Sequence, residues 1–281
     1  MMELTDKPNG TIEILHPEVW SLAMRLSPGK IVYAVSSRME DNSLVFGEIP
    51  FDGSGKDEIK EIESAVYDNR FFLYGYERRT VLSESRHFLL IPDEFSAGGD
   101  YDECCRYYKY LYPGDRLVVR ADRIEEKGVT LAFGIEPALD SFLRRTFDNP
   151  EVTHFLTPII KFFSKREHSN AANRMFVYFN DGKVGVVVLK NDNVAFANFF
   201  RFSDINDAFY YVMNAWNANG LDPLSDEMHL LGEKRCRKAL LEQFRRYVRV
   251  VVQSIFPARL LKLGRNAMDA PFDLIVLPLC E

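Results

Sequence analysis

The chain has 281 residues, of which 47% are hydrophobic and 27% are charged. This composition is typical of a soluble globular protein with one large domain or two domains of ordinary size. No apolar run approaches the length of about 18 residues that a membrane span needs, and the polar N-terminus MMELTDKPNG lacks the apolar core of a secretory signal. Four cysteines, two of them adjacent, have the spacing of neither a zinc site nor a disulfide framework. We therefore expect a cytoplasmic protein with reduced thiols and no metal site.

The charge is distributed unevenly along the chain. The net charge of −6 argues against a dedicated nucleic-acid binder. Residues 231–265, however, hold ten Lys+Arg and two Asp+Glu, a local charge of +8, so the rest of the chain carries −14. Such a basic face could contact phosphate, an acidic partner, or the acidic remainder of the chain itself.

Periodicity and turn residues predict an alternation of strands and helices. In the first half we expect strands at 21–26, 31–37 and 44–51, a helix at 57–69, strands at 79–84 and 87–91, a helix at 101–112, strands at 117–124 and 129–135, and a helix at 137–147. Asn149-Pro150 marks the predicted boundary between the halves.

The second half predicts a similar order. We expect a helical lead-in at 158–165, strands at 175–179, 184–189 and 194–202, a helix at 203–219, a strand at 228–231, a basic helix at 234–247, a strand at 248–255 and a core-forming apolar run at 272–279. The 203–219 helix should be capped by Ser203 or Asp204 and closed by Gly220.

One pattern occurs twice. Gly29-Lys30 opens the apolar run IVYAV, and Gly182-Lys183 opens VGVVV; a polar turn and a second apolar run ending in phenylalanine follow in both copies. The repeat predicts two related hairpin pairs. Three strands, a helix, a strand, a helix and a strand, given twice, is the order of the ribonuclease-H-like fold that is duplicated in actin-like ATPases.

Four stretches carry a family resemblance: LAMRLSPGKIVYAV, FLLIPDEF, THFLTPIIKFF and HLLGEKRCRKALL. Through them the chain resembles an uncharacterised bacterial domain-of-unknown-function family that is assigned the actin-like ATPase fold. The resemblance implies an α/β protein with two ribonuclease-H-like subdomains related by duplication, at 1–149 and 150–281, each with a mixed five-stranded sheet and flanking helices. The chain is more distantly similar to actin-like proteins of pilus and secretion assembly. The family implies no established activity.

An actin-like ATPase places a phosphate-binding hairpin turn in each half, usually Asp-Xaa-Gly, because a carboxylate must hold magnesium and glycine lets backbone N–H groups approach the phosphates. The matching turns here are Ser27-Pro28-Gly29 and Asn180-Asp181-Gly182. Both glycines are present, but neither first residue is a carboxylate, and Pro28 lacks an N–H donor. Asp181 comes one residue late, so strand alternation would direct it away from the site.

The adenosine-binding turn of such proteins usually carries two glycines after a buried strand. Here it reads Leu231-Gly232-Glu233, in which a carboxylate replaces the second glycine and would repel a nucleotide. Lys234 and Arg235 could offset that charge. Lys30 and Lys183 follow the turn glycines in both copies and could contact phosphate or simply solvate a hairpin.

Three functions remain open, with no catalytic residue predicted for any of them; the third, a nucleic-acid contact through the basic helix, is disfavoured by the net charge. The lost carboxylates favour a degenerate, non-hydrolysing pseudo-ATPase that acts through an unknown protein partner. The alternative is an ATP-binding ATPase or phosphotransferase that uses the inter-lobe cleft, with magnesium. Its candidate nucleotide-binding residues are Ser27, Gly29, Lys30, Asp181, Gly182, Lys183, Gly232, Lys234 and Arg235. The sequence does not indicate an oligomeric state.

Overall fold

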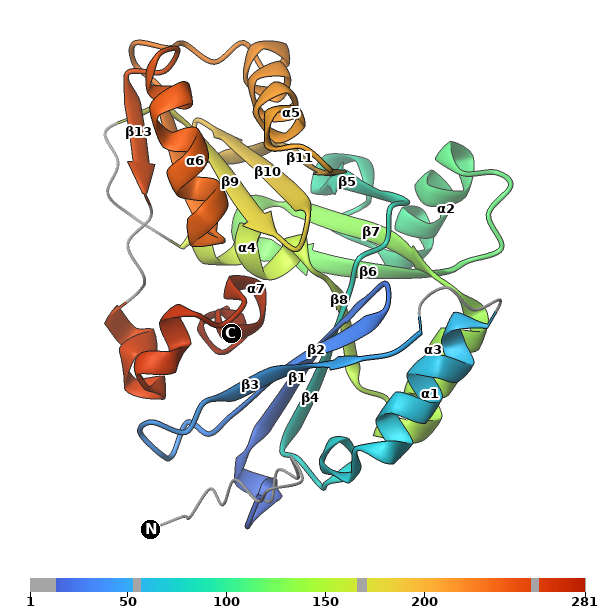
Figure 1. Ribbon diagram of the computed structural model, residues 1–281. Coiled ribbons are helices and arrows are strands. Elements are labelled where there is room, and N and C mark those ends of the chain that lie inside the picture. Colours follow the sequence, from blue (N-terminus) through green and yellow to red (C-terminus); the bar gives the residue numbers. More distant parts are fainter. Residues whose placement is uncertain (1–13, 53–56, 166–170, 254–257, 281) are drawn as a thin grey trace.

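The computed structural model describes residues 14–52, 57–165, 171–253 and 258–280 (Figure 1). Two five-stranded sheets form the cores of two lobes, and a smaller three-stranded sheet lies beside them (Figure 1). None of the helices in these ranges combines the length and the apolar character needed to cross a bilayer.

The first sheet has the order β3-β2-β1-β4-β8. Its strands are β1 (Ser21–Ser27), β2 (Lys30–Ser36), β3 (Val45–Pro50), β4 (Arg78–Ser83) and β8 (Glu151–His154). The first three strands form an antiparallel meander, whereas β4 and β8 run parallel to β1. Because β1 and β4 run in the same direction, the β1–β2 turn and the carboxyl end of β4 lie side by side, at the ends of these strands.

The second sheet repeats this arrangement with the order β11-β10-β9-β12-β13. Its strands are β9 (Asn173–Asn180), β10 (Lys183–Lys190), β11 (Asn193–Arg201), β12 (Glu227–Gly232) and β13 (Val250–Gln253). The strand directions also match those of the first sheet. The predicted duplication into two lobes with mixed five-stranded sheets is therefore confirmed.

Helices cover the outer face of each sheet (Figure 1). They are α1 (Glu58–Asp68) and α3 (Pro137–Phe147) in the first lobe and α5 (Ile205–Ala218) and α6 (Lys234–Arg245) in the second. Apolar spacing decides their orientation: Ile62 and Phe142 pack with the first sheet, and Trp216 and Phe244 pack with the second. Asp204, one of the two residues predicted to cap this helix, caps α5 by accepting the Asn206 N–H.

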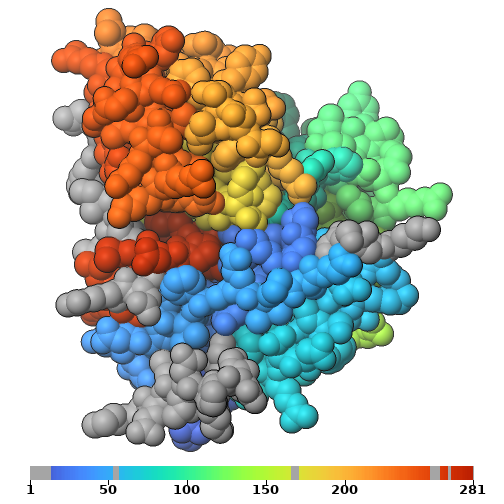
Figure 2. Space-filling view, viewed as in Figure 1, coloured from blue at the N-terminus to red at the C-terminus, as the bar shows by residue number. Residues whose placement is uncertain are grey.

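The space between the two sheets is filled rather than open. Helix α4 (Leu156–Ser164) and the C-terminal α7 (Phe272–Ile275) lie there, and their apolar side chains join the inner faces of both sheets in one core. Leu274 and Ile275 are almost fully buried, which confirms that the predicted C-terminal apolar run completes the core. Figure 2 shows this C-terminal segment wedged between the lobes on one face of the molecule.

Two features go beyond the sequence prediction. Strand β8 follows Asn149-Pro150 yet pairs with β4, so the first sheet ends at His154, five residues beyond the last residue of the predicted first subdomain. Strands β5 (Phe88–Pro92), β6 (Val118–Ile124) and β7 (Val129–Ile135), with α2 (Tyr101–Leu111), form a separate sheet in the order β5-β7-β6. Periodicity places such strands along the chain, but it does not say which sheet they join.

Candidate functional site

The two glycine-containing turns lie at the contact between the lobes, but their backbones differ. In the β1–β2 turn Pro28 fixes a negative φ and Gly29 has a φ of 77°, which is the pattern of a type II turn. In the β9–β10 turn Asp181 and Gly182 have φ values of 51° and 66°, the pattern of a type I′ turn. The two turns are related in sequence and place, yet they do not offer the same set of backbone donors.

An ion pair joins one turn directly to the other. Lys30 Nζ lies 3.0 Å from Asp181 Oδ1 and also pairs with Glu48. Burial lowers the pKa of Lys30, but these carboxylates outweigh it and hold that pKa above its ordinary value. Burial likewise raises the pKa of Asp181, but Lys30 outweighs it and the pKa is lowered. Both groups are thus charged at neutral pH and neutralise each other.

The expectation that Asp181 points away from the site is wrong. Side chains alternate between faces only along an extended strand, whereas Asp181 is a turn residue with a positive φ. The turn directs its carboxylate across the gap to Lys30 and to within 3.8 Å of Lys183 Nζ.

Lys183 reaches from the second lobe into the first. Its Nζ lies 2.8 Å from Glu84 Oε2, at the end of β4, and the side chain is only 6% exposed. Ser27 donates its hydroxyl to the same carboxylate at 2.9 Å. The interpretation that Lys183 merely solvates a hairpin is therefore wrong: the lysine is a buried cross-lobe contact.

Arg25 of β1 forms the centre of this network. Its guanidinium lies 2.5 Å from Asp273 of α7 and 3.3 Å from Glu84, and all three side chains are at most 5% exposed. Arg25 also donates to the Asn180 amide oxygen of the second turn. Burial lowers the pKa of Arg25, but Asp273 and its neighbours outweigh it, so the pKa is raised and the charge is permanent. One side chain thus ties together both lobes and the C-terminal segment.

Tyr178 completes the pairing of Asp273. Its hydroxyl donates to Asp273 Oδ1 at 2.8 Å, and burial together with the Asp273 charge raises the pKa of Tyr178 well above its ordinary value. Each oxygen of Asp273 has a donor, as a buried carboxylate requires. We call the set of Arg25, Ser27, Lys30, Glu84, Tyr178, Asn180, Asp181, Lys183 and Asp273 the inter-lobe junction.

The predicted adenosine turn connects β12 to α6, and its groups are also engaged. The Glu233 carboxylate accepts the backbone N–H of Asp181, a donor that a phosphate would need. Gly232 has a φ of 79°, and a Cβ at this position would lie 1.9 Å from the Phe179 carbonyl oxygen. The glycine is therefore required by the close packing of β12 on β9, whatever else the turn does.

Lys234 and Arg235 begin α6 and are exposed. No hydrogen bond or ion pair joins either side chain to the junction in the described part of the chain, in contrast to Ser27, Lys30, Asp181 and Lys183. The same is true of Lys238 farther along the helix, whereas Arg245 pairs with Glu242 of α6 itself. Among the described residues, the basic side chains of α6 thus form no ion pair with the acidic remainder of the chain.

A pocket adjoins the first turn. Among the described residues, Ser27 and Pro28 line it together with the carboxylates Glu58, Glu84 and Glu136, and with one cation, Arg201. A surface of this sign repels phosphate groups.

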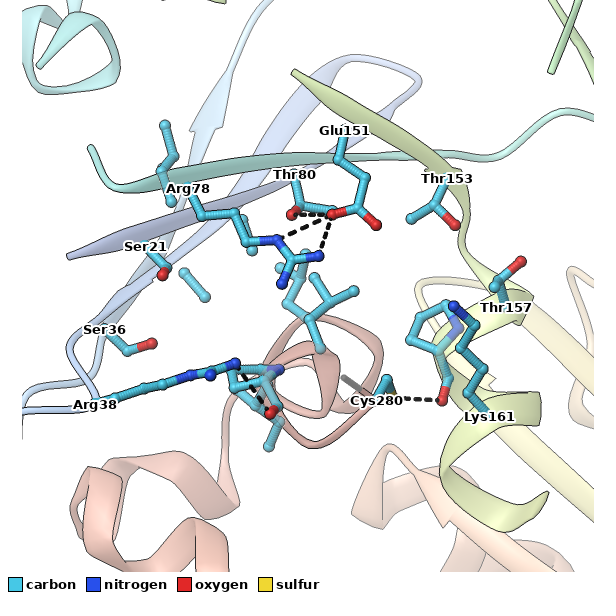
Figure 3. A pocket seen from close by; sticks show the side chains of 18 of the residues that line it. Ser21, Ser36, Arg38, Arg78, Thr80, Glu151, Thr153, Thr157, Lys161 and Cys280 are labelled. Atoms are coloured by element: carbon cyan, nitrogen blue, oxygen red, sulfur yellow. Dashed lines mark hydrogen bonds and ion pairs between the residues drawn. The ribbon is translucent and has the colours of Figure 1, made fainter. Parts of the chain in front are cut away.

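Figure 3 shows another pocket, between β1, β4, β8, α4 and the C-terminal segment. Its volume is about 160 Å³. Arg78 and Thr80 both donate to Glu151, and Arg38 donates to the Pro278 carbonyl. The polar groups of this pocket largely bind one another, and they lie at the opposite end of β1 from the hairpin turn.

Sequence reasoning missed Arg25, Glu84, Tyr178 and Asp273. The available signals were a lone arginine in the apolar strand LAMRL and a lone aspartate in the apolar run PFDLIVLPL, since buried charges need partners. Nothing in the sequence pairs these two residues, which lie 248 positions apart. Across the described ranges no three His, Cys, Asp or Glu side chains gather as metal ligands do.

The fold and the position of these turns define the class of protein, and comparison with solved structures agrees. A Bacteroides thetaiotaomicron VPI-5482 protein with an actin-like ATPase fold and unknown function is similar over 96% of this chain and 100% of its own, with a TM-score of 0.79 and 19% identity. The PilM–PilN type IV pilus biogenesis complex is similar over 94% of this chain and 100% of the other, with a TM-score of 0.54 and 13% identity. The chain has an actin-like ATPase fold.

The family follows from the sequence itself. Residues 9–251 match a family of proteins of unknown function, DUF3822, and the chain belongs to it. The sequence matches none of the curated proteins.

Proposed function

We propose that this protein is a non-hydrolysing actin-like module that acts by binding another protein and takes no nucleotide between its lobes. One observation supports the proposal: the residues of the two turns, where an actin-like ATPase is expected to hold phosphates and magnesium, bind one another. Lys30 pairs with Asp181 across the two turns, and Glu233 takes the Asp181 N–H. A nucleotide would have to break these contacts before making its own.

The energetic argument concerns the buried part of the junction. Arg25, Glu84 and Asp273 are desolvated already and satisfied by each other. Separating them to admit a triphosphate would leave buried charges without partners, at a cost of about 3–5 kcal/mol for one broken pair. The carboxylates of Glu58 and Glu136 in the adjoining pocket add repulsion.

Binding of a protein partner is a role that an actin-like fold can have without hydrolysing ATP. The chain from the PilM–PilN complex that is similar in fold belongs to an assembly of two proteins, so a protein of this fold can serve as a binding partner. Likeness of this degree gives the fold alone, and the partner of the present chain is a separate question.

Titration with Mg-ATP tests the proposal. A ligand present at about 100 times its Kd stabilises a protein by about 2.7 kcal/mol, which calorimetry and thermal unfolding both detect. We expect no binding heat and no change in Tm. Saturable heat and a raised Tm, both weakened in a Lys183→Met variant, would instead support the ATP-binding alternative.

A further inference from the structure

We propose that the groove between strands β5 and β11 binds an extended, acidic peptide segment of a partner protein by adding it as a strand to the edge of β11. The proposal gives a place and a chemistry to the protein partner of the proposed function and rests on it in that respect. Both strands are the terminal strands of their sheets. They approach one another where the small sheet meets the second lobe (Figure 1), and the Phe88 and Phe199 rings stack there at 6.0 Å.

The lining shows that the groove exposes backbone. It touches the consecutive residues 88–90 of β5 and 195–198 of β11. Because neighbouring residues of a strand point to opposite faces, a groove that touches consecutive residues lies along the strand's edge. Six of the nine lining residues have apolar side chains, yet the surface of the groove is largely polar. Arg86, Tyr112 and Asn198 contribute to this polarity, as do backbone N–H and C=O groups at a strand edge.

Hydrogen-bond register identifies the outward-facing groups of β11. Phe202 donates its N–H to the Gly182 carbonyl, so alternate residues back along the strand, Phe200 and Asn198, face β10. Ala197 and Phe199 then face the groove. The Phe199 N–H is taken by the Asn198 side chain, whereas the Ala197 backbone has no partner outside its own sheet among the described residues.

The same reasoning applies to β5. Gly134 donates to the His87 carbonyl and Asp93 donates to the Gly128 carbonyl, so Phe88 and Leu90 face the groove. The Phe88 carbonyl accepts the Tyr112 hydroxyl. At the two touching rings, the Phe88 carbonyl and the Phe199 N–H thus have side-chain partners. Among the described residues, the outward-facing backbone groups of Leu90 and Ala197 have none outside their own sheets.

Strand β11 also has little of the usual protection of an edge. Exposed edges normally carry charges, proline or bulges, or are short, because they otherwise pair with other chains. Apart from β5, which forms the other wall of the groove, the other edge strands follow this rule: β3 holds Glu48 and Pro50, β6 holds Arg120, Asp122 and Arg123, and β8 and β13 have four residues each. Residues 194–200 of β11, VAFANFF, contain neither charge nor proline. The strand has a register shift between Val194 and Phe196, at the start of the groove, and its pairing with β10 is regular from Phe196 onward. Such a long apolar edge strand is explained if a segment of another chain pairs with it.

Charge decides the chemistry of that occupant. Of the described residues that line the groove, Arg86 is the one that is charged. It is exposed, and in the described part of the chain it makes no ion pair. A carboxylate on the added strand would pair with it, while backbone hydrogen bonds supply most of the affinity, as in other cases of strand addition.

The test begins with a phage-displayed library of random linear peptides, selected on the full chain and counter-selected on an Ala197→Pro variant. Proline at this edge position removes the outward N–H without breaking the ladder to β10. Synthetic copies of the selected peptides should contain Asp or Glu among apolar residues. Their affinity should fall by about tenfold or more in Ala197→Pro and be retained in Ala197→Val, which keeps the N–H.

A second variant keeps the test decisive if Ala197→Pro fails to fold. Arg86 lies on a surface bend, so Arg86→Glu should fold normally and weaken acidic peptides by about tenfold or more. Failure to select any peptide, or peptides that bind all variants equally, overturns the proposal. So does a concentration-dependent dimer that Ala197→Pro abolishes, since the occupant is then a second copy. These outcomes are independent of the Mg-ATP titration, which alone decides whether nucleotide binds.

Discussion

Replacing Arg25 by methionine tests whether the junction holds the lobes together. The substitution keeps a long side chain but leaves Asp273, which is fully buried, without its cation, and removes one partner of Glu84. Removing one member of a buried ion pair costs about 3–5 kcal/mol. For a chain of this size that corresponds to a fall in Tm of roughly 6–20 °C. Thermal unfolding by circular dichroism, with urea unfolding for the free energy, measures it.

Two variants sharpen this prediction. Lys30→Met removes a cation whose partners are partly exposed, at 34% for Asp181 and 55% for Glu48, so it should cost about 1 kcal/mol or less. Combining Arg25→Met with Asp273→Asn removes the uncompensated charge and keeps an oxygen for Tyr178, so it should recover at least half of the loss. An Arg25→Met protein as stable as Lys30→Met, or a double variant no better than the single one, would refute this reasoning.

Two further predictions concern packing and pH. Gly232→Ala should destabilise the fold by several kcal/mol, because its Cβ meets the Phe179 carbonyl at 1.9 Å, whereas Gly220→Ala, with a φ of 58° and open space around it, should cost about 1 kcal/mol; chemical denaturation of both compares them. Burial lowers the pKa of His154 to about 4 and raises that of Asp122 to about 6. As the pH falls from 6.5 to 4, His154 therefore lowers the free energy of unfolding, because the unfolded state binds the proton more readily. As the pH falls from 6 to 4, Asp122 raises the free energy of unfolding, because the folded state binds the proton more readily. Each effect is about 1.4 kcal/mol per pH unit. On acidification from pH 6 to 4 in urea, His154→Gln should gain stability and Asp122→Asn should lose it; equal slopes in the two would contradict these assignments.

Much of the fold could be predicted from local pattern. Apolar periodicity and turn glycines place the hairpins around Gly29 and Gly182 within a residue or two of their observed ends, and the repeat predicts the equal sheets. Local pattern does not report long-range pairing, however. It did not place β8 in the first sheet or separate β5, β6 and β7 from it, because a strand's partner is chosen by tertiary packing.

The site was harder to predict than the fold. The absence of Asp at Ser27 and Asn180 is visible in the sequence. The contacts around these turns are not, because Arg25 and Asp273 meet only where the C-terminal segment lies between the sheets. The predicted direction of the Asp181 side chain was wrong for a local reason, since a turn residue with positive φ does not follow strand alternation.

The most direct test of an occupied junction is an experimental crystal structure determined from crystals grown with Mg²⁺ and a non-hydrolysable ATP analogue. We predict no nucleotide density between the two turns, with the Lys30–Asp181 and Arg25–Asp273 pairs intact. Phosphate density between Gly29 and Gly182, with these pairs broken, would contradict the account.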